Sequence, residues 1–282
     1  MRIRAKIQKS DDNKTLIITE IPFGTTTTKI IETIMRAVQI LEFGDVKFSE
    51  LSKLKMSAFY NCKKLRSVEI LSGLTIIGDS SWSNGAFESC VELERVVLPA
   101  TLTTIGRNTF KGCSAIEECD IPQSVTYIYS AAFANCQNYS TVLNLPNLTS
   151  VDVDAFYSTK ITGIQSLGKI TAIGNNQWGN MTFDACSHLR YAILPETLTT
   201  IGRFPFRNCS SLEAVCFRGE TPPTLVATSA FSGSTCLFYV PDNSVTAYQE
   251  ASVWSSFASR IKGISQLATD NPTLYAKIEE YL

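Results

Sequence analysis

The stretch Val96–Gly106 reads VVLPATLTTIG, and Ala192–Gly202 repeats it nearly letter for letter as AILPETLTTIG. Each copy follows a Phe that comes directly after a small residue, and eight such pairs recur at similar intervals between Phe59 and Phe231. Successive Phe residues of these pairs lie 28, 23, 23, 23, 27, 23 and 25 positions apart. A repeat of this length folds as one supersecondary unit that cannot enclose its own apolar side chains. The sequence therefore predicts a solenoid of about eight coils of 23 residues, in which stacking buries a continuous core.

Each coil is expected to contain two short extended segments joined by turns. In the second unit, the alternation over Leu93–Leu98 predicts a strand, and Pro99 closes it. A second extended piece covers Leu102–Ile105, and Gly106 follows at a turn that tolerates positive φ. The stretch Ala86–Leu93 is too short for an ordinary helix and predicts a turn or a single 3₁₀ turn.

Two columns of buried side chains are expected along the stack. The eight Phe residues share one repeat position, so each should pack on its equivalents in neighbouring coils. Six of the nine Cys residues lie three positions after the Phe, which favours small buried hydrophobes with free thiols. A strand spacing of about 4.8 Å is near the Cα separation of a disulfide, so disulfides, or a metal or redox site, are the alternatives. The predicted structural ladder consists of Cys62, Cys90, Cys113, Cys136, Cys186 and Cys209 with Phe59, Phe87, Phe110, Phe133, Phe156, Phe183, Phe206 and Phe231.

This pattern resembles the BspA-type leucine-rich repeats, whose consensus is close to L-x-x-V-x-L-P-x-x-L-x-x-I-G-x-x-A-F-x-x-C. The resemblance covers roughly residues 52–240 and implies a leucine-rich-repeat solenoid built mainly of short β-strands and turns. Two coils depart from the consensus, because Tyr139 stands at the Leu position of unit four and Ser158–Thr159 stand near the Cys position of unit five. BspA-like proteins are commonly surface or secreted adhesion modules of bacteria, so the resemblance implies adhesion to a protein or glycan.

The two ends of the chain differ from the repeat, which divides the sequence into residues 1–45, 46–240 and 241–282. The first segment alternates as two strands around a turn and continues as a Thr-capped helix, which predicts a small α+β segment. The last segment opens with a helix-like run whose apolar residues include Tyr248 and Trp254, and it predicts a helical C-terminal cap. Residues 266–282 are expected to form a last helix or an oligomer contact.

A short run in the amino-terminal segment carries a second resemblance. Thr15–Thr28 reads TLIITEIPFGTTTT and is similar to a stretch of the bacterial type IIA DNA topoisomerase A subunit. The similarity spans only about 38 residues of the sequence and does not include the catalytic Arg-Tyr pair of that family, so it implies no strand-cleaving tyrosine. Three roles stay open for the segment: closing the first coil, oligomerisation or attachment, and binding of nucleic acid or a partner of that enzyme through its basic residues.

Composition and motifs argue against several classes of function. A net charge of -1 gives no global field for nucleic acid or an anionic membrane, and no uninterrupted apolar run is long enough for a transmembrane helix. The amino terminus lacks the apolar run of a secretory signal. No P-loop, GxGxxG or HExxH motif is present, and His188, the only histidine, is expected at the coil surface. We therefore expect no enzyme activity, cofactor or metal site.

The two longest intervals between successive repeat Phe residues, 28 and 27 positions, contain one Trp each. Trp82 lies in GDSSWSNGAF, and Trp178 lies in GNNQWGNMTF. Insertions on one edge of a solenoid often carry binding, and an indole is a common interface or sugar-stacking group. These residues are the candidate ligand contacts, although each Trp could instead fold back to cover its widened coil. The main hypothesis is a noncatalytic protein- or glycan-binding module, with a role in adhesion or surface interaction. The alternative is an intracellular scaffold or nucleic-acid-associated protein that uses residues 1–45.

Overall fold

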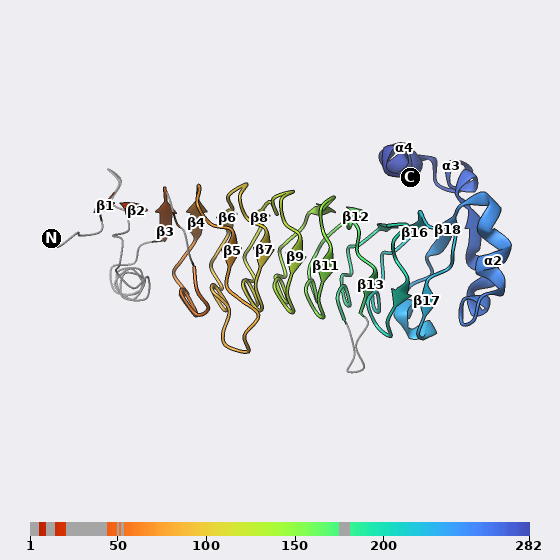
Figure 1. Ribbon diagram of the computed structural model, residues 1–282, viewed down its shortest axis with the longest axis horizontal. Helices are drawn as coiled ribbons and strands as arrows, with labels where there is room; N and C mark the ends of the chain where they lie inside the picture. The colour runs from red at the N-terminus through yellow and green to blue at the C-terminus, as the bar shows by residue number, and fades with distance from the viewer. Residues whose placement is uncertain (1–5, 10–14, 21–43, 50, 52–53, 175–180) are drawn as a thin grey trace. The chain divides into compact units, whose positions relative to one another are not determined.

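The computed structural model describes residues 6–9, 15–20, 44–49, 51, 54–174 and 181–282, and it divides the chain into two compact units, Met1–Tyr139 and Ser140–Leu282. Within each unit the chain winds into stacked coils, as Figure 1 shows. The predicted solenoid of short strands and turns is confirmed. The helices that the structure describes lie near the C-terminus.

In each unit, one strand of each coil contributes to a six-stranded sheet that runs along the stack of that unit. All pairings in these sheets are parallel except the hairpin of β1 with β2. The first unit forms its sheet from β1 (Lys6–Lys9), β2 (Thr15–Glu20), β3 (Asp45–Phe48), β4 (Ser67–Ile70), β6 (Arg95–Val97) and β8 (Glu118–Cys119). The second unit uses β10 (Val142–Asn144), β12 (Gly163–Ser166), β14 (Tyr191–Leu194), β16 (Ala214–Phe217), β18 (Leu237–Val240) and β19 (Ile261–Gly263).

A second, shorter strand follows the corner of most coils. In the first unit these strands are β5 (Ile76–Ile77), β7 (Thr104–Ile105) and β9 (Tyr127–Ile128). In the second unit they are β11 (Ser150–Val151), β13 (Ala172–Ile173), β15 (Thr200–Ile201) and β17 (Thr224–Leu225). The predicted extended piece over Leu102–Ile105 is thus present as β7, and the stretch from Ala86 to Leu93 forms turns, as expected.

The Phe side chains stack inside each unit. Phe87 lies 5.1 Å from Phe59 and 5.6 Å from Phe110, measured between ring centroids, with nearly parallel planes. Phe183 stands in the same relation to Phe156 and Phe206, at 5.5 and 5.4 Å. Offset-stacked aromatic pairs contribute about 0.5–1.5 kcal/mol each beyond their buried area.

Tyr139 fits into this core although it breaks the consensus. Its ring stacks on Phe133 at 5.3 Å, and its hydroxyl donates a hydrogen bond to the Cys119 carbonyl at 2.7 Å. A buried hydroxyl costs stability unless it is hydrogen-bonded. This bond removes that cost and lets a tyrosine replace the consensus leucine.

Every coil contains a residue in the left-handed backbone region two positions after the Phe. The eight residues are Asn61, Ser89, Gly112, Asn135, Ser158, Ala185, Asn208 and Gly233, with φ between 56° and 83°. This conformation turns N–H groups along the stack, so that Asn208 donates to the Ser232 carbonyl of the next coil at 2.7 Å. Gly adopts the left-handed conformation without strain because it has no Cβ, and a short polar side chain such as that of Asn can offset the strain by a local hydrogen bond. For most other residues the Cβ makes this conformation costly.

Gly106 is required for a different reason than the sequence predicted. Its φ is not positive. A Cβ at this position would lie 2.5 Å from the Asp79 amide nitrogen and 2.7 Å from the Ile77 carbonyl oxygen. The close approach of the preceding coil therefore excludes a side chain.

The C-terminal region closes the second unit with helices, but the predicted helix-like run is interrupted. It comprises η1 (Thr228–Phe231), η2 (Asp242–Ser244), α2 (Val245–Glu250), η3 (Trp254–Arg260), η4 (Ile264–Gln266), α3 (Leu267–Asp270), α4 (Pro272–Ile278) and η5 (Glu279–Tyr281). Trp254 is fully buried, contacts Phe217 and Phe238 edge-on at 5.3 and 5.4 Å, and donates to the Pro223 carbonyl at 2.8 Å. Ile261 begins β19 instead of continuing the helix.

The amino-terminal hairpin belongs to the sheet of the first unit. β2 pairs with β3 in parallel register, and Ile18 is buried. The helix predicted after the hairpin falls outside the described residues. The division into residues 1–45, 46–240 and 241–282 stays a prediction.

Replacing Ala185 by Gly is expected to stabilise the protein. Ala185 has a φ of 60°, and relief of the left-handed strain should raise the free energy of unfolding by about 1 kcal/mol. Denaturant unfolding monitored by circular dichroism measures the effect. The control Ala192→Gly in β14, where the backbone is extended, should lower the free energy of unfolding by about 1 kcal/mol. No gain from Ala185→Gly would contradict the strain argument.

Candidate functional site

Trp82 lies on the widened turn between β5 and β6 and is the most exposed of the large hydrophobic side chains described, with 88% of its surface accessible. The Arg107 guanidinium lies 3.7 Å from the centroid of its ring. Arg107 also donates from Nε to the Ser80 carbonyl at 3.4 Å. Such a cation–π contact contributes about 0.5–1 kcal/mol at an exposed site. The Trp82 indole therefore does not cover the coil. Its ring is exposed to solvent at the edge of the coil, where it packs against the Arg107 guanidinium.

The turn around Trp82 is also held by its own polar groups. Asp79 accepts a hydrogen bond from the Ser81 amide at 2.7 Å, and the Ser81 and Ser83 hydroxyls lie 3.1 Å apart. The edge of the first unit therefore presents a supported aromatic surface. Trp178, the second predicted contact, lies outside the described residues and stays a prediction.

The outer face of the first unit's sheet is charged and internally paired. Glu69 binds Lys47 at 2.8 Å and also binds Arg95, which in turn lies 3.2 Å from Glu118. Hydrogen bonds from Lys47 and Arg95 hold the pKa of Glu69 below its ordinary value. The face therefore carries both positive and negative side chains, and the charges of neighbouring coils pair with one another.

The cysteines of the ladder are buried free thiols, and those after the first coil donate to a carbonyl of the preceding coil. All nine cysteines are free and buried. The thiols of Cys90 and Cys113 donate to the Phe59 and Phe87 carbonyls of the preceding coil, each at 3.0 Å. Cys209 does the same to Phe183 at 3.1 Å. A small apolar side chain that can also donate a weak hydrogen bond suits this position.

Coils five and eight place a hydroxyl where the others have a thiol. Thr159 donates to the Phe156 carbonyl at 3.0 Å and lies 3.3 Å from the Cys186 sulfur. Ser234 donates to the Phe231 carbonyl at 3.0 Å. These hydroxyls bond the Phe carbonyl of their own coil, whereas the thiols bond the Phe carbonyl of the preceding coil.

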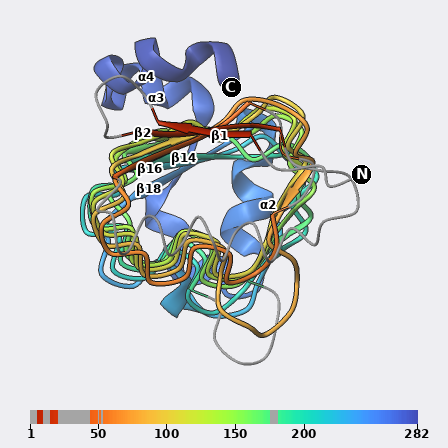
Figure 2. The same ribbon diagram turned by 90° about the vertical axis from the view of Figure 1, so that its left-hand side faces the viewer.

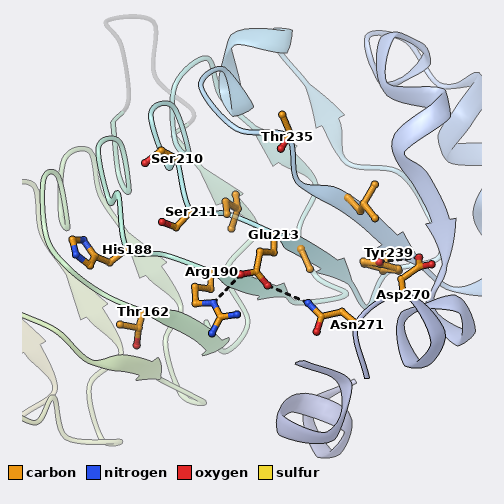
Figure 3. Close-up of a pocket in the computed structure, with 13 residues that line it drawn as sticks. Thr162, His188, Arg190, Ser210, Ser211, Glu213, Thr235, Tyr239, Asp270 and Asn271 are labelled. Atoms are coloured by element: carbon orange, nitrogen blue, oxygen red, sulfur yellow. Dashed lines mark hydrogen bonds and ion pairs between the residues drawn. The ribbon is translucent and has the colours of Figure 1, made fainter. Parts of the chain in front are cut away.

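A polar groove of about 690 Å³ lies on the second unit, beside the start of β16 (Figure 3). Arg190 Nε lies 2.8 Å from Glu213 Oε1, and Asn271 Nδ2 donates to Glu213 Oε2 at 3.1 Å. Hydroxyls of Ser211 and Thr235 also line the groove. These groups can offer hydrogen bonds to a polar ligand.

Sequence reasoning missed this groove because Glu213 and Asn271 are 58 positions apart and belong to different parts of the pattern. A signal was present in the strands themselves. YAIL in β14 and AVCF in β16 are buried on both faces, whereas the alternation of other coils predicts one exposed face. A continuous apolar strand at a solenoid surface indicates that something covers it.

The expected surface position of His188 is confirmed, since it is exposed and its Nδ1 lies 3.2 Å from the Ser187 hydroxyl. Within the described ranges, no three His, Cys, Asp or Glu residues are placed to hold a metal ion. In the same part of the chain, no helix has the length and apolar character needed to cross a membrane.

Comparison with known proteins agrees with the repeat geometry. The BspA type leucine rich repeat region matches residues 41–85, 52–181 and 176–256, which is most of the chain. The chain belongs to this family. Membership of this family indicates a repeat-based protein-interaction module. The matched residues begin after the run that resembles the topoisomerase subunit, so that resemblance stays a prediction.

Solved structures of two leucine-rich repeat proteins are similar to this BspA-type chain. The Treponema pallidum protein TpLRR is 20% identical, with a TM-score of 0.53 over 74% of this chain and 87% of that one. A Bacteroides ovatus protein is 21% identical, with a TM-score of 0.56 over 86% of this chain, and the match spans 59% of the Bacteroides protein. At these identities the similarity shows the fold. None of the curated proteins matches the chain.

The buried thiols should make stability depend on pH in the alkaline range. Burial raises the pKa of Cys186 from 9.0 to about 12, so the folded state keeps a proton that the unfolded state loses. The stabilisation is complete below the unfolded pKa and is lost as pH rises from that value toward the folded one.

Cys186→Ser, which imitates Ser234, removes this group and keeps a donor. Between about pH 8 and about pH 10, the wild type should lose about 1 kcal/mol more unfolding free energy than the variant. Urea unfolding at each pH measures the difference. Equal losses in the two proteins would show that Cys186 does not retain its proton.

Proposed function

We propose that this BspA-type module serves in adhesion, and that it binds a protein or glycan ligand through the edge that carries Trp82. The observation that carries the proposal is the 88% exposure of Trp82 on the Arg107 guanidinium. An isolated exposed indole has an unfavourable contact with water that a ligand can remove. Tryptophan and arginine are also among the residues that dominate binding energies at interfaces.

The position of Trp82 in the coil supports the same role. The widened turn Asp79–Gly85 projects from the stack, so its sequence can vary without changing the buried columns. Arg107 comes from the following coil, and it contacts both the Trp82 ring and the Ser80 carbonyl of the same turn. A ring that is already ordered loses less conformational entropy on binding than a free side chain.

Replacing Trp82 by Ala should reduce ligand binding strongly. The full chain is tested against immobilised extracellular-matrix proteins and glycans, and affinities are measured for those that bind. Trp82→Ala should weaken binding roughly 30-fold, which corresponds to about 2 kcal/mol at a central contact residue. Trp82→Phe should retain part of the affinity. Tyr60→Ala removes another exposed aromatic side chain of the first unit and should leave binding unchanged. Unchanged binding by Trp82→Ala would exclude this edge as the binding site.

The location of the protein tests the adhesion role separately. Protease treatment of intact source cells should cleave the chain, while a cytosolic control protein stays intact. Protection until the cells are lysed would contradict adhesion. It would favour the scaffold or nucleic-acid-associated role of residues 1–45, which a salt-dependent DNA shift lost on removal of those residues would then test.

A further inference from the structure

The outer face of the second unit's sheet is apolar where the equivalent face of the first unit carries charges. Its outward side chains form two rows in the strand register, Tyr191–Ala214–Leu237 and Ile193–Cys216–Tyr239. The middle strand β16 thus carries the small side chains, and β14 and β18 carry larger ones on either side. Apart from the half-buried Leu237, all of these residues are at most 2% exposed.

The C-terminal segment, residues 264–282, covers this face. Figure 2 shows α3 and α4 outside the sheet, above β14, β16 and β18. Leu267, Leu274 and Ile278 pack into one cluster with the outward residues of the three strands. Lys277 lies over the Tyr191 ring, with its Nζ 5.4 Å from the centroid. The segment therefore binds the face as an amphipathic helix binds an apolar surface.

The polar contacts of the C-terminal segment with the rest of the second unit lie near its start and near the turn between α3 and α4. The Ser265 amide and hydroxyl both donate to Asp242 Oδ1, at 3.2 and 2.9 Å. Asp270 accepts from the Tyr239 hydroxyl at 3.0 Å and binds Lys262 at 2.8 Å. Asn271 caps α4 and donates to Glu213. Because α4 has only seven residues, it cannot stay helical without the surface it covers.

The C-terminal segment leaves one buried polar group of this surface without a hydrogen bond and leaves the neighbouring groove open. The Tyr191 hydroxyl is buried beneath it and has no hydrogen-bond partner among the described residues. The groove of Arg190, Ser211 and Thr235 continues the surface past the start of β16, where the segment does not fill it (Figure 3). A longer segment with an acceptor for Tyr191 and polar groups for the groove would make contacts that residues 264–282 do not make.

We propose that the outer face of β14, β16 and β18 is a docking surface for an amphipathic helix of a partner protein, and that residues 264–282 occupy it in the free chain. The partner helix carries two apolar residues four positions apart, as Leu274 and Ile278 are, and a Lys or Arg next to the second, as Lys277 is. Its polar extension lies in the groove. This surface is independent of Trp82.

Cys216 reports directly on displacement of the C-terminal segment. It is the cysteine that lies in the outer cluster, under α3 and α4, whereas Cys209 belongs to the inner column. Maleimide labelling of the full chain, followed by mass spectrometry, should modify Cys216 at least about tenfold faster than Cys209, because local opening needs less free energy than global unfolding. Equal rates for the two thiols would mean that the segment is a fixed cap and would overturn the proposal.

Substitutions in α4 test which side chains hold the surface closed. Ile278→Asp should speed Cys216 labelling at least about tenfold without changing Cys209. Ala276→Asp adds the same charge on the exposed side of the same helix and should change neither. If Ile278→Asp also exposes Cys209, Asn271→Ala replaces it as the variant and should speed Cys216 labelling about threefold. No acceleration in either variant would overturn the proposal.

A synthetic peptide of residues 264–282 is the probe for docking. It should bind the Ile278→Asp chain at least about tenfold more tightly than the wild type, where the resident segment competes, and it should slow Cys216 labelling. A peptide with Ile278→Asp should not bind. Failure of the natural peptide to bind the opened chain would show that the face does not dock a helix. Concentration-dependent dimers of the wild type would instead assign the surface to a second copy.

Discussion

The phenylalanines of successive coils stack on one another within each unit, and this packing constrains the rest of the structure. The rings stack at 5.1 to 5.6 Å in the first unit, which requires the backbones of successive coils to be equally close. That closeness explains why Gly106 has no room for a side chain. It also brings the thiol of one coil to the Phe carbonyl of the previous coil. The requirement for glycine at position 106 and the bond made by the cysteine both follow from one packing distance.

The parts of the fold that repeat could be predicted from the sequence, because the same pattern of buried residues around a Phe occurs in eight successive units. The Phe spacing predicts the coil, and the Pro after the strand predicts its end. The left-handed turn two positions after the Phe was not predicted, although Asn, Gly and Ser recur there. Ala185 obscures that signal, since the left-handed conformation is unfavourable for alanine. The signal becomes visible only when the hydrogen bonds between coils are known.

Features that occur once were much harder to predict. Trp82 was identified as a candidate contact, but its support by Arg107, which is 25 positions further along the chain, depends on the distance between two coils. The cover over β14 and β16 depends on the last residues folding back, and a short amphipathic helix is equally compatible with an oligomer contact. The alternation rule fails at YAIL and AVCF because these strands contact apolar side chains on both faces. Such a failure points to a surface with a second occupant.

The unpaired thiols have a consequence for when and where the chain can fold. Once the coils have stacked, nine buried sulfhydryl groups are shielded from oxidants, so the finished protein needs no reducing surroundings. The unfolded chain has no such shield, and nine exposed sulfhydryls can cross-link in many wrong combinations. Folding must therefore finish before oxidation begins. Under oxidising conditions, the yield of folded protein therefore depends on the rate of coil stacking relative to the rate of disulfide formation.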